Sequence, residues 1–273
     1  MMKHVLTLLF IFNTVTGFTQ KKINWHDVTQ WGVEGRGWAD QKRMKWFDRF
    51  PAKAEKTVTK SVWGLSRHSA GMMVRFKTDA NAIHAKWKVT SARLGMPHMP
   101  PSGVSGLDLY ARDTKGNWRW AAATRPSKQV MQATLLRGIK PGLREYGLYL
   151  PRYNGTESLE VGVPEGAKVE RLAPRKAKPL IFYGTSITHG ACASRPGITH
   201  PAILGRRLEM PVINIGFSGN GRMHEAVGKL MAEVDAACYV IDCLPNMNAA
   251  AVTERCVPLV KLLRKARPDT PIV

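Results

Sequence analysis

Residues 180–188 read Leu-Ile-Phe-Tyr-Gly-Thr-Ser-Ile-Thr, a short apolar run that ends in glycine and hydroxyl side chains. Such a continuous apolar run is typical of a strand that is covered on both faces. Two similar strands follow at Val212–Ile215 and Cys238–Ile241, and Pro271–Val273 starts a fourth. Segments with helical spacing separate them, so the sequence predicts an α/β fold, a parallel sheet with helices on both faces. The predicted helices are Ile198–Leu208, Met223–Val234 and Ala249–Ala266.

Polar residues follow each of the three strands. The segments are Gly184-Thr185-Ser186-Ile187, Gly216-Phe217-Ser218-Gly219 and Asp242-Cys243-Leu244-Pro245-Asn246. Because the carboxyl ends of parallel strands meet at one edge of a sheet, we expect these segments to form a site there. A serine hydroxyl, a backbone N–H at a glycine and an asparagine amide suit acyl transfer, which needs a nucleophile and donors to a developing negative oxygen.

Other interpretations of these residues stay open at this point. Ser186 has the residue type of a helix N-cap. The glycines from Gly216 to Gly221 suggest a phosphate-binding turn, although the lysine of a P-loop is absent and the spacing is not Gly-x-Gly-x-x-Gly. His189, His200 and His224 lie close in sequence to the first two segments, and each is a weak candidate for a general base.

The three segments, in this order after three predicted strands, resemble the sequence blocks of the SGNH (GDSL-like) hydrolase superfamily. The resemblance implies a serine ester hydrolase with a flavodoxin-like sheet. It assigns Ser186 as the nucleophile, the backbone N–H of Gly219 to the oxyanion hole, and the side chain of Asn246 as the second oxyanion donor. It implies no cofactor and no metal.

The chain departs from the family pattern in places. Thr185 stands where aspartate is common, and the residues around Asn246 differ from the usual Gly-x-Asn-Asp. The fourth block, Asp-x-x-His, supplies the general base and its orienting acid, and it does not occur after Ser186. We therefore expect residues 180–273 to be the amino-terminal portion of a truncated hydrolase domain, without the Asp and His of the triad.

The part before residue 164 has a different pattern, in which short strand-like runs alternate with turn residues. Seven such strands at this spacing predict a β-sandwich accessory domain over residues 21–163. The segment Gly103–Tyr110 also resembles the β-domain of some exported bacterial members of the superfamily. Residues 164–179 are rich in Pro, Lys and Arg and are predicted to be a linker. The seven strands are Gly71–Lys77, Ile83–Val89, Gly106–Arg112, Trp118–Ala123, Gln132–Leu136, Tyr146–Leu150 and Ser158–Val163.

The first twenty residues have the order of a signal peptide: a basic start, an apolar run from Val5 to Val15, and the small Gly17. The run is too short to span a bilayer, and no other run approaches that length. Residues 1–20 therefore predict a secreted or periplasmic protein without a membrane span. A buried amino-terminal strand is the alternative.

The net charge of +21 from 41 basic and 20 acidic residues lies mostly before residue 181. It suggests either a polyanion-binding surface or a solvated basic surface. The bases are scattered, so we expect no specific nucleic-acid binding. The four cysteines include no C-x-x-C pair that would suggest zinc. Cys192 and Cys243 flank the predicted site, and we expect them to be either a disulfide or two separate thiols.

Two functions are compatible with these patterns. The first is an ester hydrolase that acts on a small-molecule or carbohydrate ester, and deacetylation of a sugar is one form of it. The second is a non-catalytic, basic, Trp-rich protein that binds polysaccharide. The tryptophans of the first part predict either a sugar-stacking platform or a hydrophobic core. The sequence leaves the acyl substrate and the oligomeric state undetermined.

Overall fold

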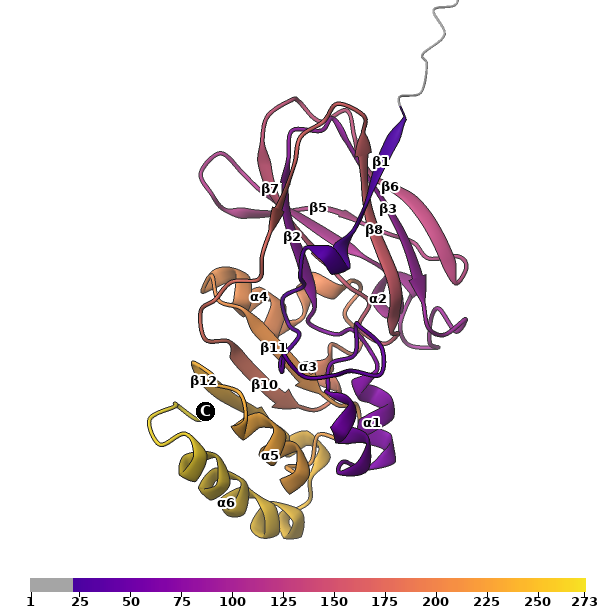
Figure 1. Cartoon of the computed structure of the whole chain (residues 1–273). Coiled ribbons are helices and arrows are strands. Elements are labelled where there is room, and N and C mark those ends of the chain that lie inside the picture. The colour runs from indigo at the N-terminus through magenta and orange to yellow at the C-terminus, as the bar shows by residue number, and fades with distance from the viewer. Residues whose placement is uncertain (1–21) are drawn as a thin grey trace, which may run out of the picture.

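The computed structural model describes residues 22–273, and the predicted signal peptide lies outside the described residues. Two antiparallel sheets form one end of the molecule (Figure 1). Their strands are β1 (Ile23–Asp27), β2 (Met73–Thr78), β3 (Ala82–Val89), β4 (Asp108–Arg112), β5 (Trp118–Ala123), β6 (Val130–Arg137), β7 (Arg144–Tyr149), β8 (Thr156–Pro164) and β9 (Val169–Leu172). One sheet has the order β1-β8-β3-β6 and the other β5-β4-β7-β2-β9.

The two sheets share a hydrophobic cluster, because alternate side chains of each strand point to the same face. Val74 and Phe76 of β2 contribute from one sheet, and Ala85 and Trp87 of β3 from the other. All seven strands predicted in this part are present. Two strands were not predicted, β1 and β9. Because β9 pairs with β2, the segment predicted as a linker is partly built into a sheet.

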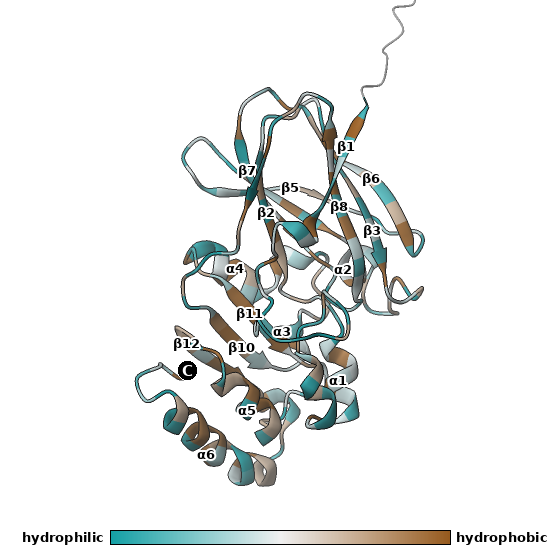
Figure 2. Ribbon diagram, in the orientation of Figure 1, coloured by the Kyte–Doolittle hydropathy of each residue, from teal (hydrophilic) through white to brown (hydrophobic). Residues whose placement is uncertain are grey.

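The parallel sheet consists of β10 (Leu180–Gly184), β11 (Val212–Gly216) and β12 (Cys238–Asp242). Its order is β11-β10-β12, the flavodoxin-like order expected from the sequence. Figure 2 shows hydrophobic residues along β10 and β11. At the end of the chain Ile272 forms a parallel bridge with Tyr239 of β12.

Helices cover both faces of the parallel sheet, as predicted (Figure 1). Leu204 of α4 packs near Phe182 on one face, whereas Val227 of α5 and Leu259 of α6 pack on the other. The α-helices are α1 (Lys60–Ser66), α2 (Pro101–Val104), α3 (Ser186–His189), α4 (His200–Arg207), α5 (Glu225–Ala232) and α6 (Ala249–Ala266), and the 3₁₀ helices are η1 (Val28–Gln30), η2 (Ala52–Lys56), η3 (Pro196–Ile198) and η4 (Leu244–Asn246).

The segment between β1 and β2, which includes α1, contributes to the core of the parallel sheet. Trp38, Phe50 and Val62 are buried in the cluster that also contains Phe217. The indole nitrogen of Trp38 donates to the carbonyl oxygen of Leu230 at 3.1 Å. The packing therefore does not follow the predicted division at residue 163, since part of residues 21–163 completes the α/β core.

The five-stranded sheet lies between the four-stranded sheet and α4. Met73, Tyr110 and Tyr149 on its outer face cluster with Ala202 of α4. The buried Glu34 also joins the two parts, because its carboxylate accepts from Arg75 at 3.1 Å and from Arg175 at 2.6 Å. No helix within residues 22–273 has the length and apolar character needed to cross a membrane.

Candidate active site

The carboxyl ends of the three parallel strands lie side by side. Gly184 at the end of β10 is in register with Gly216 of β11 and with Asp242 of β12. The three segments predicted to carry the site therefore start from one edge of the sheet, and the middle strand leads to Ser186.

Ser186 is the first residue of α3, directly after β10. Thr185 is the N-cap, since its hydroxyl accepts from the N–H of Ile187 at 3.2 Å. The N-cap interpretation of Ser186 is therefore wrong. The turn is held by both neighbouring strands, because Thr188 donates to Asp242 Oδ2 at 2.6 Å and the Asn214 amide donates to Thr188 O at 2.7 Å.

Gly219 lies in the loop that follows β11. Its φ of +69° is in the left-handed region, which glycine adopts without strain. The residue is exposed, and within residues 22–273 its N–H donates to no protein acceptor. The loop is fixed at its base by the N–H of Phe217, which donates to Gly184 O at 2.8 Å. The N–H of Gly219 is therefore available to a bound group.

Asn246 is the last residue of η4, after β12. Its side-chain Nδ2 donates to the carbonyl oxygen of Gly221 at 3.3 Å. Gly221 packs so closely on Gly184 that an added Cβ would lie 1.9 Å from the Gly184 carbonyl oxygen. Asn246, the loop of Gly219 and the strand before Ser186 are thus connected through Gly221.

The three candidate histidines have partners other than Ser186 in the described part of the chain. His189 is fully buried, stacks on Tyr153 with ring centroids 4.0 Å apart, and donates from Nε2 to Arg152 O at 2.7 Å. Burial, together with the charge of Arg49, lowers the pKa of His189 well below its usual range. The ring of His200 packs edge-on against Phe182, and His224 is the N-cap of α5. Within residues 22–273 no histidine ring is hydrogen-bonded to Ser186.

Two residues near the site were not identified from the sequence. The hydroxyl of Tyr153 donates to Ser186 O at 3.4 Å. Arg49 is buried and donates from Nη1 to Asn214 O at 3.0 Å and to Gly216 O at 2.8 Å. Both come from the part predicted as an accessory domain, and no local pattern marks them, because their roles depend on contacts between segments far apart in the chain.

The cysteines are four free thiols, so a disulfide between Cys192 and Cys243 is wrong for this structure. Cys192 is exposed, whereas Cys243 is buried and its Sγ lies 3.6 Å from Tyr183 O. The part of the chain that the structure describes contains no group of three metal-ligating side chains.

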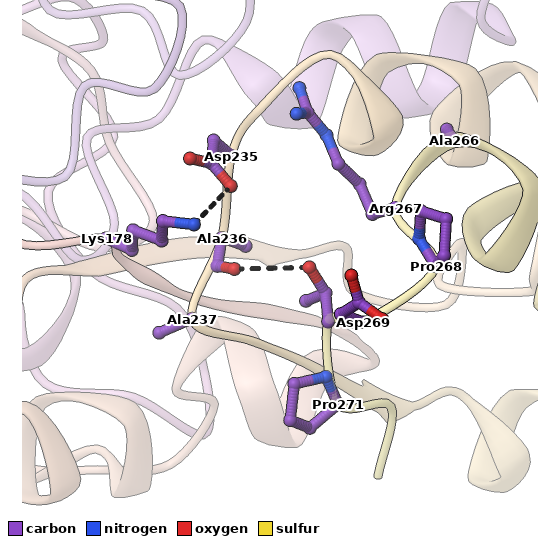
Figure 3. A pocket seen from close by; sticks show the side chains of 10 residues that line it. Lys178, Asp235, Ala236, Ala237, Ala266, Arg267, Pro268, Asp269 and Pro271 are labelled. Atoms are coloured by element: carbon purple, nitrogen blue, oxygen red, sulfur yellow. Dashed lines mark hydrogen bonds and ion pairs between the residues drawn. The ribbon is translucent and has the colours of Figure 1, made fainter.

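A pocket of about 350 Å³ lies at the opposite edge of the parallel sheet (Figure 3). Lys178 and Ala237 line it just before β10 and β12 begin, and Lys178 Nζ is 3.0 Å from the Asp235 carboxylate. Because sites of open α/β sheets form at the carboxyl ends of the strands, this pocket is not the candidate active site.

The loops at the carboxyl ends of this parallel sheet carry a serine, an asparagine amide and a glycine N–H without an acceptor in residues 22–273, which are residue types suited to acyl transfer. Family models agree with this chemistry. The model for the N-terminus of SGNH hydrolase-type esterases, with the motif GxDLY, matches residues 23–169, and the GDSL-like lipase/acylhydrolase model matches residues 177–273. The chain belongs to this family of GDSL-like, SGNH hydrolase-type esterases.

Solved structures give the same fold. A protein from Bacteroides ovatus assigned to the GDSL-like lipases is 33% identical, with a TM-score of 0.85 over 92% of this chain and 73% of that one. A salicylyl-acyltransferase from a tetracycline biosynthetic pathway is 20% identical, with a TM-score of 0.66 over 88% of this chain and 68% of that one. An acetyl xylan esterase from the rumen bacterium Butyrivibrio proteoclasticus is 11% identical, with a TM-score of 0.54 over 91% of this chain and 80% of that one. A search of curated proteins gave no match.

Proposed function

We propose that the protein hydrolyses esters with Ser186 as nucleophile and with an oxyanion hole formed by the Gly219 N–H and the Asn246 amide. The observation that carries the proposal is the junction of the three strand-end loops through Gly184 and Gly221, with the Gly219 N–H free of any acceptor in residues 22–273. Membership of an esterase family supports the same chemistry.

In this proposal the Ser186 oxygen attacks the acyl carbon and its proton passes to a base. The carbonyl oxygen becomes an oxyanion that accepts from Gly219 N–H and Asn246 Nδ2. The alcohol leaves with a proton, and water then hydrolyses the acyl-serine. Since no histidine of residues 22–273 is hydrogen-bonded to Ser186, the proposal assigns the proton acceptor to none of His189, His200 and His224. We therefore propose that an added base such as imidazole accelerates the reaction.

We propose an acylated carbohydrate as the substrate. Two solved structures that share the fold are carbohydrate esterases, the Butyrivibrio proteoclasticus enzyme and one from Cellvibrio japonicus. Trp120 is 54% exposed and offers an indole face to a sugar ring. The signal-like order of residues 1–20 supports export to the periplasm or the medium, where such substrates occur.

The test is acetate release from acetylated xylo-oligosaccharides, measured with and without imidazole. We expect imidazole to increase turnover and Ser186→Ala to reduce it by a factor on the order of 10² or more. Ser127→Ala, an exposed serine in the loop after β5, is the matched control. Equal turnover in Ser186→Ala and wild type, or no acetate release by the protein, would overturn the proposal.

The alternative is a non-catalytic protein that binds polysaccharide. It is favoured by the net charge of +21 and by the exposed Trp120. A binding protein would retain glycan without releasing acetate, and Ser186→Ala would leave its affinity unchanged. The acetate assay therefore distinguishes the two functions.

A further inference from the structure

A groove of about 720 Å³ opens between the β4–β5 hairpin and α4, and it shares no lining residue with the pocket described above. This volume is within the range of small-molecule sites. The hairpin contributes aromatic side chains and the α4 region contributes basic ones. The lining residues from the hairpin are Tyr110, Gly116, Asn117 and Trp118, and those from the α4 region are Arg195, Ile198, Ile203, Arg206, Arg207 and Glu209.

The groove has an excess of positive charge. Its one lining carboxylate, Glu209, is engaged by Arg112, with Oε2 2.5 Å from Nη2. Asp108 lies behind the groove, fully buried, and accepts from the Gly197 N–H at 2.7 Å and the Trp120 indole at 3.0 Å. Within residues 22–273, neither Arg206 nor Arg207 forms an ion pair. The nearby Asp108 pairs with Arg195 at 3.5 Å, so the exposed guanidinium of Arg207 and that of Arg206 are left without a direct acidic partner among the described residues.

Arg206 is held in place by aromatic rings. Its guanidinium lies 3.8 Å from the centroid of Tyr110 and 5.3 Å from that of Tyr149. Its buried Nη1 has no hydrogen-bond acceptor among the described residues. A buried N–H without an acceptor is costly, and a guanidinium binds carboxylate or sulfate groups through parallel hydrogen bonds.

The groove also contains stacking surfaces for a sugar. The guanidinium of Arg112 lies 4.2 Å from the ring of Trp118, which lines the groove. The neighbouring Trp120 is 54% exposed and has the guanidinium of Arg195 at 4.8 Å from its ring. The segment that follows α3 connects the two sites, since Arg195 lies nine residues beyond Ser186. A ligand in the groove would therefore contact Arg195, which belongs to the segment that follows the proposed nucleophile in the chain.

We propose that this groove binds a negatively charged oligosaccharide, with a carboxylate or sulfate group on Arg206 and Arg207 and a sugar ring against the exposed Trp120. That the ligand is a carbohydrate rests on the proposed function. The inference adds that the substrate is an anionic glycan.

The probes for calorimetric titration are tetragalacturonate, a sulfated galactose tetrasaccharide, neutral galactotetraose and a single-stranded oligodeoxynucleotide. We expect at least one anionic tetrasaccharide to bind about tenfold or more tightly than the neutral one, and added salt to weaken it. The tighter of the two anionic sugars identifies the charged group. Equal affinity for the neutral sugar, or tighter binding of the oligonucleotide, overturns the inference.

Single substitutions locate the site. Arg206→Gln and Arg207→Gln should each weaken binding by about tenfold. Arg207 is exposed, so its variant remains informative even where Arg206→Gln fails to fold. Arg137→Gln is the control, because this exposed arginine of β6 makes the same charge change on the other sheet. Equal affinities of Arg206→Gln, Arg207→Gln and the control Arg137→Gln for the anionic sugar would overturn the inference.

The acetate assay keeps this inference separate from the proposed function. Binding of the anionic sugar without acetate release, either from neutral acetylated xylo-oligosaccharides or from acetylated oligogalacturonate, would refute the proposed hydrolase activity and would leave the proposed anion-binding groove supported. Acetate release that depends on Ser186, without binding of either anionic sugar, would refute anion binding by the groove and would support the hydrolase activity.

Discussion

Arg49 Nη1 donates to the carbonyl oxygen of Gly216 at 2.8 Å and so connects the irregular segment before β2 to the last residue of β11. The side chain is fully buried, and its hydrogen bonds go to carbonyl oxygens, including Leu65 O at 2.6 Å. Burial lowers the pKa of Arg49 to about 9, which leaves it charged at neutral pH. Because the loop of Gly219 begins at Gly216, Arg49 fixes the start of the proposed oxyanion loop.

Arg49→Met should lower the free energy of unfolding by about 3 kcal/mol, because several buried carbonyl groups lose their donor. Urea denaturation followed by circular dichroism measures the loss. The variant should also reduce kcat for acetate release more than it changes KM, since the oxyanion loop loses its support. Arg137→Met on the exposed face of β6 is the control and should stay within about 0.5 kcal/mol of wild type. Wild-type stability of Arg49→Met would contradict a bracing role.

Gly221→Ala should disrupt the junction between the strand ends. The new Cβ would lie 1.9 Å from Gly184 O, a backbone atom that cannot move without shifting β10. We expect a loss of about 2 kcal/mol or more in stability and a lower kcat for acetate release. Thermal unfolding and the acetate assay measure the two effects.

The matched control is Gly64→Ala in α1, where an added Cβ meets nothing within 4 Å. Alanine favours helix over glycine by about 1 kcal/mol, so this variant should be neutral or more stable. If Gly221→Ala behaved like Gly64→Ala, the close packing at the strand ends would not be required for the site.

Local sequence patterns were sufficient to predict most of the strands of the fold. Alternating side chains and turn residues indicated the seven strands of the antiparallel sheets, and apolar runs indicated β10, β11 and β12. The strand β9 was not predicted, because the Pro, Lys and Arg residues around it are typical of a linker. Its pairing with β2 is a long-range interaction that no local pattern indicates. Trp38 belongs to the α/β core for the same reason, since its partner Leu230 is almost two hundred residues away.

The candidate site was predictable where it depends on strand ends. Ser186, Gly219 and Asn246 follow three neighbouring parallel strands, and topology alone brings such loops together. Arg49 and Tyr153 were not predictable, because they reach the site from the antiparallel part through contacts between domains. The N-cap position of Thr185 was missed because both Thr185 and Ser186 have suitable side chains.

Stability should fall in acid because of the buried histidines. Burial lowers the pKa of His68 to about 3, and it lowers the pKa of His189 well below its usual 6.5. The unfolded chain takes up these protons near pH 6.5, whereas the folded protein does not. The free energy of unfolding is therefore greatest above pH 6.5 and should fall as the pH drops toward 4, by up to about 1.4 kcal/mol per pH unit for each histidine.

His189→Phe tests this origin, because phenylalanine keeps a ring against Tyr153 but cannot take up a proton. Urea unfolding between pH 4 and 7 should show a shallower slope, reduced by up to about 1.4 kcal/mol per pH unit, together with a lower stability at pH 7 from the lost bond to Arg152 O. His98→Gln, an exposed residue, is the control. An unchanged slope in His189→Phe would exclude this histidine as a source of the acid sensitivity.

The thiols should differ sharply in reactivity. Cys192 is exposed, whereas burial raises the pKa of Cys243 to about 12. The thiolate is the reactive form, so Cys192 should react fast with a disulfide reagent in the native protein and Cys243 only on unfolding. Cys192→Ser should remove the fast phase, and the denatured, unreduced wild type should titrate as four thiols. Two missing thiols in oxidised material would restore the disulfide between the nucleophile and oxyanion loops and would contradict the free cysteines of the structure.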